Sequence, residues 1–79
     1  MTQHRSLSTI ARDISKHWAK PYFAARPYLS AMHSLDAITD DYYADSARSV
    51  VLYFLSNAAT WRGDDAKRIK AELREMLRD

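Results

Sequence analysis

The sequence predicts an all-α fold, a compact bundle of about four helices. Apolar residues recur every three or four positions along nearly the whole chain, which is the spacing of amphipathic helices. The composition is 47% hydrophobic and 11% aromatic, as in a folded protein. One glycine and two prolines leave few places where helices can break. Because 79 residues are short even for one domain, we expect a single helical domain over residues 1–79.

The first predicted helix follows an apolar stripe that contains Leu7, Ile10, Ile14 and Trp18. Ser6 or Ser8 can cap its N-terminus, and Lys20-Pro21 ends it, because a residue before proline disfavours the helical conformation. Pro21 and Pro27 both suit the first turn of a new helical piece. The sequence therefore predicts a short second helix after Pro27, whose apolar stripe contains Tyr28, Leu29, Met32 and Leu35.

Residues 36–45 are polar and turn-like, and we expect no strand in the chain. Asp45 or Ser46 can cap a third helix, which we expect to run over roughly 45–61. Apolar residues cover most of its circumference, so it is predicted to be the central and most buried helix: Val50, Val51, Leu52, Phe54, Leu55, Ala58 and Trp61. Gly63 is placed where a left-handed residue ends a helix, and Asp64 begins the last helix, with Ala66, Ile69, Leu73, Met76 and Leu77 on its apolar face.

The composition excludes several classes of protein. With no cysteine there is no disulfide, thiolate zinc site or thiol catalysis, which makes the cytoplasm the expected location. The first 20 residues contain no apolar run of signal-peptide length, and no stretch reaches the roughly 20 apolar residues of a membrane span, so we expect no membrane association. The net charge of +2 is too small to indicate nucleic-acid binding by itself.

The sequence contains no recognisable catalytic motif, which predicts a protein that is not an enzyme. Nucleophile-elbow, zinc-protease and phosphate-loop motifs are all missing from the sequence. The histidines His4, His17 and His33 are not spaced four apart as metal ligands on one helix, so we expect no metal or cofactor. The carboxylates Asp36, Asp40, Asp41 and Asp45 lack the order and the glycine of a calcium loop, and turn or capping roles suit them better.

An aromatic segment is the main candidate for partner binding. Residues 17–28, HWAKPYFAARPY, combine four large aromatic side chains with cations, a mixture typical of binding hot spots. The alternative is that these rings fill the corner between two helices. The predicted partner-binding residues are Tyr22, Phe23, Arg26, Tyr28, Tyr42 and Tyr43.

A basic stripe on the last predicted helix is the candidate for nucleic-acid contact: Lys67, Lys70, Arg74 and Arg78. In the alternative interpretation this is an ordinary solvated face, in which Arg68 pairs with Asp64 and Glu72 at helical spacing. A helix-turn-helix built around Trp61-Arg62-Gly63 is the sharpest DNA-binding hypothesis. It would bring the N-terminus of the last helix into the major groove, and there Asp64 and Asp65 oppose phosphate.

Three segments resemble a family of small bacteriophage and prophage proteins, chiefly of actinobacterial hosts. They are HWxxxYFxAxPYLxAM (His17 to Met32), DSARSVVLYFLSNAATWRG (Asp45 to Gly63) and IKAEL (Ile69 to Leu73). The likeness spans roughly residues 17–77. It implies a phage or prophage accessory product in the host cytoplasm, and it transfers no activity and no functional residue.

These observations predict a small non-enzymatic module that binds a protein, as a phage-derived inhibitor or adaptor of a host or phage protein, or as a homodimer. A small helical chain with surplus aromatic side chains and no catalytic set acts by contact. The alternative is a DNA-binding regulator that uses the helix pair around Trp61 to Gly63.

Overall fold

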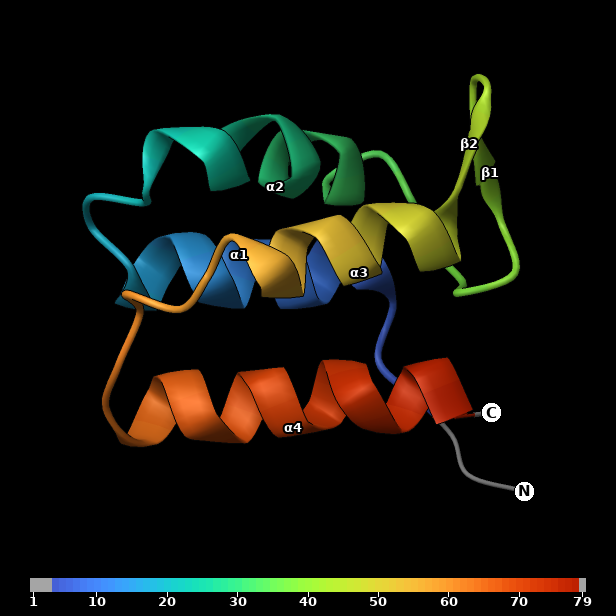
Figure 1. Cartoon of the computed structure of the whole chain (residues 1–79). Coiled ribbons are helices and arrows are strands. Elements are labelled where there is room, and N and C mark those ends of the chain that lie inside the picture. Colours follow the sequence, from blue (N-terminus) through green and yellow to red (C-terminus); the bar gives the residue numbers. More distant parts are fainter. Residues whose placement is uncertain (1–3, 79) are drawn as a thin grey trace.

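The computed structural model describes residues 4–78 and shows a mostly helical, compact fold (Figure 1). Its helices are α1 (Leu7–His17), α2 (Arg26–Met32), α3 (Ala47–Ser56) and α4 (Asp64–Arg78), with a short 3-10 helix, η1 (Phe23–Ala25), directly before α2. Two strands, β1 (Asp41–Tyr42) and β2 (Asp45–Ser46), form an antiparallel hairpin. The prediction of a helical bundle is therefore confirmed in outline, and the prediction of no strand is wrong. Residues 1–3 and 79 of the predicted domain lie outside the described part.

The four α-helices form a ring in which each helix packs against the next one along the chain, and α4 returns to pack against α1. Successive helices run in opposite directions, and the hairpin and η1 lie at opposite ends of the bundle (Figure 1). This topology gives α4 two flanks, one beside α1 and the other beside α3. The two flanks carry different chemistry, as described below.

Hydrogen-bonding serine caps begin α1 and α3, as their positions in the sequence predict. The Ser6 hydroxyl accepts a hydrogen bond from the Thr9 N–H, and the Ser46 hydroxyl accepts one from the Ser49 N–H. Each cap satisfies a backbone donor that has no partner inside its helix. The first turn of α1 is also joined to the chain after α2, because the N–H groups of residues 7 and 8 donate to the carbonyls of residues 36 and 35 at 2.8 Å.

The core is apolar throughout, since the described residues include no buried polar or charged side chain. Its largest fully buried side chains come from all four α-helices: Phe54, Leu7, Ile10, Ile14, Met32, Ile69, Leu73, Met76 and Val51. Trp18 and Trp61 stack at one end of this core, with ring centroids 5.3 Å apart. The apolar stripes that the sequence indicates are therefore the surfaces that pack together.

Helix α3 is shorter and less buried than the sequence predicts. It ends at Ser56 instead of near Trp61, and Asn57 follows it as the C-cap. The Asn57 amide donates to the Tyr53 carbonyl at 2.8 Å, which satisfies one of the last carbonyls of the helix. Leu52 and Tyr53 are each 52% exposed, so α3 has one solvent face and is not buried all round.

The hairpin occupies the polar segment that the sequence assigns to turns. Asp41 pairs with Ser46 and Tyr42 with Asp45, which leaves a two-residue turn at Tyr43 and Ala44. Tyr43 has a φ of +54°, an uncommon conformation for a bulky residue. The Asp40 carboxylate accepts hydrogen bonds from the backbone N–H groups of residues 36 and 37. Asp40 thus has the turn role predicted from the sequence.

Candidate functional site

Four of the six predicted partner-binding residues lie in one region, on η1, on α2 and in the turn before them. Phe23 is 72% exposed and Tyr22 is 44% exposed, and their rings meet edge to face at 4.9 Å. Tyr28 is half-buried, and its ring lies 5.4 Å from that of Tyr53 on α3. We call Tyr22, Phe23, Tyr28 and Tyr53 the aromatic surface. Helix–helix corner packing accounts for Tyr28, whereas Tyr22 and Phe23 face solvent.

Arg26 begins α2 beside this aromatic surface. Its side chain is exposed, and its Nε donates to the Pro21 carbonyl at 3.3 Å, across the turn that carries Tyr22 and Phe23. The sequence between Asp13 and Asp36 contains no acidic residue, while Lys16, Lys20 and Arg26 all fall within it. The stretch of chain that carries Tyr22, Phe23 and Tyr28 therefore contributes positive charge and no negative charge.

The other two predicted partner-binding residues, Tyr42 and Tyr43, lie apart from the aromatic surface, on the hairpin at the opposite end of the bundle (Figure 1). Tyr42 is half-buried against the core, whereas Tyr43 is 92% exposed at the turn. Their rings meet edge to face at 4.8 Å. The structure thus divides the six residues into two separate groups, one beside cations and one beside the acidic residues of the hairpin.

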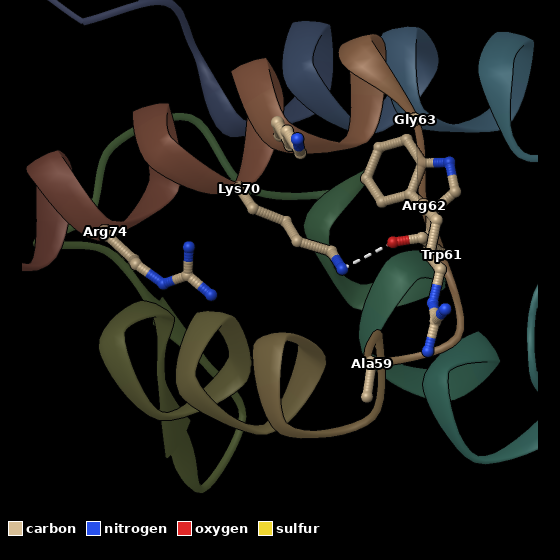
Figure 2. Close-up of a pocket in the computed structure, with 7 residues that line it drawn as sticks. Ala59, Trp61, Arg62, Gly63, Lys70 and Arg74 are labelled. Carbon is tan, nitrogen blue, oxygen red and sulfur yellow. Dashed lines mark hydrogen bonds between the residues drawn. The ribbon is translucent and has the colours of Figure 1, made fainter.

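A pocket of about 600 Å³ lies where α4 faces the end of α3 and the connection between the two helices. Figure 2 shows Lys70 reaching from α4 to the carbonyl of Trp61, with Arg74 directed into the space between the helices. Four cationic side chains and no carboxylate line this pocket. We call it the basic pocket; it is lined by Ala59, Trp61, Arg62, Gly63, Lys67, Lys70 and Arg74.

The acidic side chains that could neutralise α4 lie on its other flank, beside α1. Arg5 donates to both carboxylate oxygens of Glu72, at 2.9 and 2.6 Å, and also to Asp13 at 3.0 Å. Arg68 donates to Asp13 at 3.2 Å and to Asp65 at 3.1 Å. The predicted pairing of Arg68 with Asp64 and Glu72 is therefore wrong, because Glu72 pairs with Arg5, which precedes α1, and Arg68 pairs with Asp13 of α1 and with Asp65.

This network shifts the ionisation of its members. Hydrogen bonding to Glu72, and then to Asp13, raises the pKa of Arg5. Burial by itself would raise the pKa of Asp13, but hydrogen bonds from Arg5 and Arg68 lower that pKa below its ordinary value. His17 completes the cluster, with Nδ1 2.9 Å from an Asp13 oxygen and Nε2 3.6 Å from an Asp65 oxygen. The flank of α4 beside α1 is thus a paired, structural surface.

The flank beside α3 is not paired. Within residues 4–78, no ion pair involves Arg62, Lys67, Lys70 or Arg74. Lys70 Nζ donates to the Trp61 carbonyl at 2.6 Å and lies 5.9 Å from the centroid of the Trp61 ring. Burial, together with the nearby charges of Arg74 and Arg62, lowers the pKa of Lys70 below its ordinary value. The basic pocket therefore concentrates positive charge that the described chain does not compensate.

Three of the four residues predicted for nucleic-acid contact line the basic pocket, and one does not. Lys67, Lys70 and Arg74 lie along one side of α4, while Arg78 is outside the lining and pairs with Glu75. Sequence reasoning missed Arg62 as a member of this set. The available signal was its position directly before the glycine that ends the α3–α4 connection.

The α3–α4 pair differs from a helix-turn-helix. Residues 57–63 connect the two helices, a longer link than the three or four residues of that motif, and the helices lie side by side in opposite directions (Figure 1). Gly63 does have the predicted positive φ, +109°, but it stands directly before α4 and not at the end of α3. Nucleic-acid contact by this helix pair stays a prediction without the expected motif geometry.

No helix within residues 4–78 is both long and apolar enough to cross a bilayer. Over the same residues, no group of three or more His, Asp or Glu side chains is placed to hold a metal ion. Among the histidines, His33 lies 3.3 Å from the Ser15 hydroxyl and His17 belongs to the Asp13 cluster.

No protein-family model, curated protein or solved structure matches this chain.

Proposed function

We propose that this protein is a non-enzymatic binding module that docks another protein on its aromatic surface. The observation that supports the proposal is the exposure of Phe23 and Tyr22, 72% and 44%, on the segment that also carries Tyr28. Aromatic side chains contribute a large share of binding energy at interfaces, because they offer much contact area at a low entropic cost. The phage-protein resemblance adds a role as inhibitor or adaptor in the cytoplasm of a bacterial host.

Charge complementarity indicates what kind of partner fits. Three of the four residues of the aromatic surface, Tyr22, Phe23 and Tyr28, belong to a stretch of chain with three cations and no acid, so an apolar patch with an acidic rim complements it. A symmetric dimer through this surface would place like charges opposite each other, because a two-fold interface pairs the same patch with itself. The proposed occupant is therefore a different protein with an acidic, partly apolar surface.

A reconstituted complex tests this proposal. A partner captured from an actinobacterial lysate is identified, purified and titrated by calorimetry with the wild-type chain and with Phe23→Ser. Phe23→Ser is expected to raise the Kd by at least about tenfold, because loss of a hot-spot side chain costs more than 1.4 kcal/mol. Tyr43→Ser removes an exposed aromatic ring outside this surface and is the matched control, with an unchanged Kd expected.

Two outcomes would contradict the proposal. Equal Kd values for wild type and Phe23→Ser would remove the aromatic surface from the interface. Sedimentation that shows a wild-type dimer which Phe23→Ser dissociates would make a second copy of the chain the occupant.

Nucleic-acid binding is the second candidate function, and the unpaired cations of the basic pocket favour it. Phosphate contacts make affinity fall steeply with salt, whereas apolar contacts do not. A gel-shift titration of a duplex at two salt concentrations, with wild type and Lys67→Gln, tests this candidate. Loss of a phosphate contact is expected to lower the salt slope by about one unit.

A further inference from the structure

The basic pocket combines two properties that favour the binding of an anion, concavity and positive charge. Its volume of about 600 Å³ lies within the range of small-molecule sites. Arg62 contributes from the α3–α4 connection, and Lys70 and Arg74 contribute from α4 (Figure 2). Lys67 of α4 is the fourth cation of the lining. The four cations therefore reach one space from two separate elements.

The spacing of the cations sets the size of a matching anion. Lys67, Lys70 and Arg74 follow one another at three and four residues and share one side of α4. At 1.5 Å per residue, the seven steps from Lys67 to Arg74 cover roughly 10 Å along the helix axis. Two or three linked phosphates extend along more of that length than a single phosphate, so they can contact more of these cations without drawing their side chains together.

Lys70 is held at the centre of this charge. Its hydrogen bond to the Trp61 carbonyl and its position over the Trp61 ring fix the ammonium group inside the pocket. Burial and the charges of Arg74 and Arg62 disfavour the protonated form and lower the pKa of Lys70. A bound anion would offset this repulsion, because an opposite charge within hydrogen-bonding distance favours the charged form of a lysine.

We propose that the basic pocket binds a small molecule that carries two or more phosphate groups. Arg62 and Arg74 supply guanidinium forks that bind phosphate oxygens in pairs, and Lys67 and Lys70 supply point charges between them. A compact ligand fits better than a nucleic-acid strand for two reasons. The site is concave, and the exposed carboxylate of Asp64, which follows Gly63, would repel a long polyanion that runs past the pocket.

Inorganic pyrophosphate is the probe for this site, titrated at constant ionic strength. Trp61 lines the pocket and stacks on Trp18, so tryptophan fluorescence follows binding without a label, and amide chemical shifts locate it. Saturable binding is expected, with shifts centred on Trp61, Gly63 and Lys70. Arg74→Gln and Lys70→Met are each expected to raise the Kd by about tenfold or more, since each removes a charged hydrogen-bond donor.

Arg78→Gln is the matched control, because it removes the same charge from the same helix outside the pocket. Its Kd is expected to stay within about twofold of wild type. Melting curves accompany every variant, and Arg74 is the more informative of the two pocket substitutions because its side chain is exposed. An equal loss of affinity for Arg78→Gln and Arg74→Gln, or no saturable binding by the folded wild type, would overturn the proposal.

A second arm separates this proposal from nucleic-acid binding and from protein docking. A duplex oligonucleotide at the same phosphate concentration is expected to compete weakly for the site. Tighter binding by the duplex than by pyrophosphate would overturn the small-molecule assignment. Phe23→Ser, which tests the aromatic surface, is expected to leave pyrophosphate binding intact, so either proposal can fail without the other.

Discussion

The indole rings of Trp18 and Trp61 lie stacked, with centroids 5.3 Å apart and planes 8° from parallel. Trp18 follows the last residue of α1, and Trp61 belongs to the connection between α3 and α4. Phe54 of α3 meets the Trp18 ring edge-on at 6.2 Å. The tryptophan pair thus joins the ends of three helices at one end of the bundle, and it also positions the Trp61 carbonyl that holds Lys70.

Replacement of Trp61 tests the contribution of this stack to stability. Trp61→Ala is expected to lower the free energy of unfolding by about 3–5 kcal/mol, because it removes a large buried ring and leaves a cavity beside Trp18. Urea denaturation followed by circular dichroism measures the change. Phe23→Ala, which removes an aromatic ring that is 72% exposed, is the control with little expected loss. Similar losses for the two variants would contradict the placement of Trp61 in the core.

Gly63 is expected to be needed for its backbone conformation and not for space. Its φ is +109°, and a Cβ atom built there meets no other atom within 4 Å. Gly63→Ala should therefore cost about 1–2 kcal/mol of stability, from the strain of an L-residue in a left-handed conformation. Lys67→Ala, at an exposed position of α4, is the control with no cost expected. Thermal melting checks both, and equal tolerance would show that the chain passes residue 63 in another conformation.

Tyr43 occupies a conformation that asparagine adopts more readily. Tyr43→Asn at the hairpin turn is expected to raise stability by up to about 1 kcal/mol, through relief of the positive-φ strain. Tyr42→Asn is the opposite test, because its half-buried ring packs against the core and its loss should destabilise. Chemical denaturation compares both variants with wild type. A loss of stability for Tyr43→Asn would show that the exposed ring contributes more, through Tyr42, than the strain removes.

The stability of the protein is expected to decrease in acid because of Asp13. Hydrogen bonds from Arg5 and Arg68 lower the pKa of Asp13 in the folded state, so the unfolded state binds the proton more tightly. The contribution of Asp13 is therefore complete above its ordinary pKa, about 4, and is lost as the pH falls through the lower folded value. Urea midpoints between about pH 5 and pH 2 measure this loss.

Two variants separate the carboxylates that act in this pH range. Asp13→Asn is expected to flatten the acid limb of the stability curve. Asp40→Asn should flatten it further, because hydrogen bonds from the backbone N–H groups of Ala37 and Asp36 lower the pKa of Asp40 as well. Curves parallel to wild type for both variants would assign the acid sensitivity to other groups.

Local signals in the sequence were sufficient to predict where three of the helices begin. Ser6 and Ser46 cap their helices, and Asp64 begins α4, because each choice depends on a side chain and the few residues beside it. The apolar stripes were also predictable, since the buried residues recur at helical spacing. These features depend on local propensity and on burial, which the sequence records directly.

The end of α3 was not predictable from the same pattern. Ala58 and Trp61 continue the spacing of Phe54 and are buried as expected, yet they lie in a turn beyond the helix. Apolar spacing indicates which residues face the core, but it does not distinguish a continuing helix from a connection that folds back onto the same core. The hairpin was not predicted either. Its turn contains Tyr43 at a position where glycine or asparagine is the usual signal of a hairpin.

The aromatic surface was predictable from the sequence, whereas the basic pocket depended on tertiary structure. Phe23 and Tyr22 are exposed where their density with cations suggested a contact surface. The positive charge of the basic pocket was underestimated. The sequence suggested that the acids of α4 pair with cations of the same helix, as Arg68 would with Asp64 and Glu72, and this made the basic stripe look like an ordinary solvated face. In the structure Glu72 pairs with Arg5, which precedes α1, and Arg68 pairs with Asp13 of α1. These contacts depend on the packing of α4 against α1, and they leave the basic pocket on the other flank without a carboxylate in its lining.

The link between Arg5 and Glu72 spans 67 residues of chain, the longest separation among the side-chain hydrogen bonds of the described residues. Contacts within the α1–α2–α3 segment close short loops, whereas the docking of α4 closes the longest one and bears its entropic cost. The basic pocket depends on α4, because three of its four cations, Lys67, Lys70 and Arg74, belong to that helix. A proteolytic cut in the α3–α4 connection would therefore separate Lys67, Lys70 and Arg74 from the part of the chain that contains α1, α2 and α3.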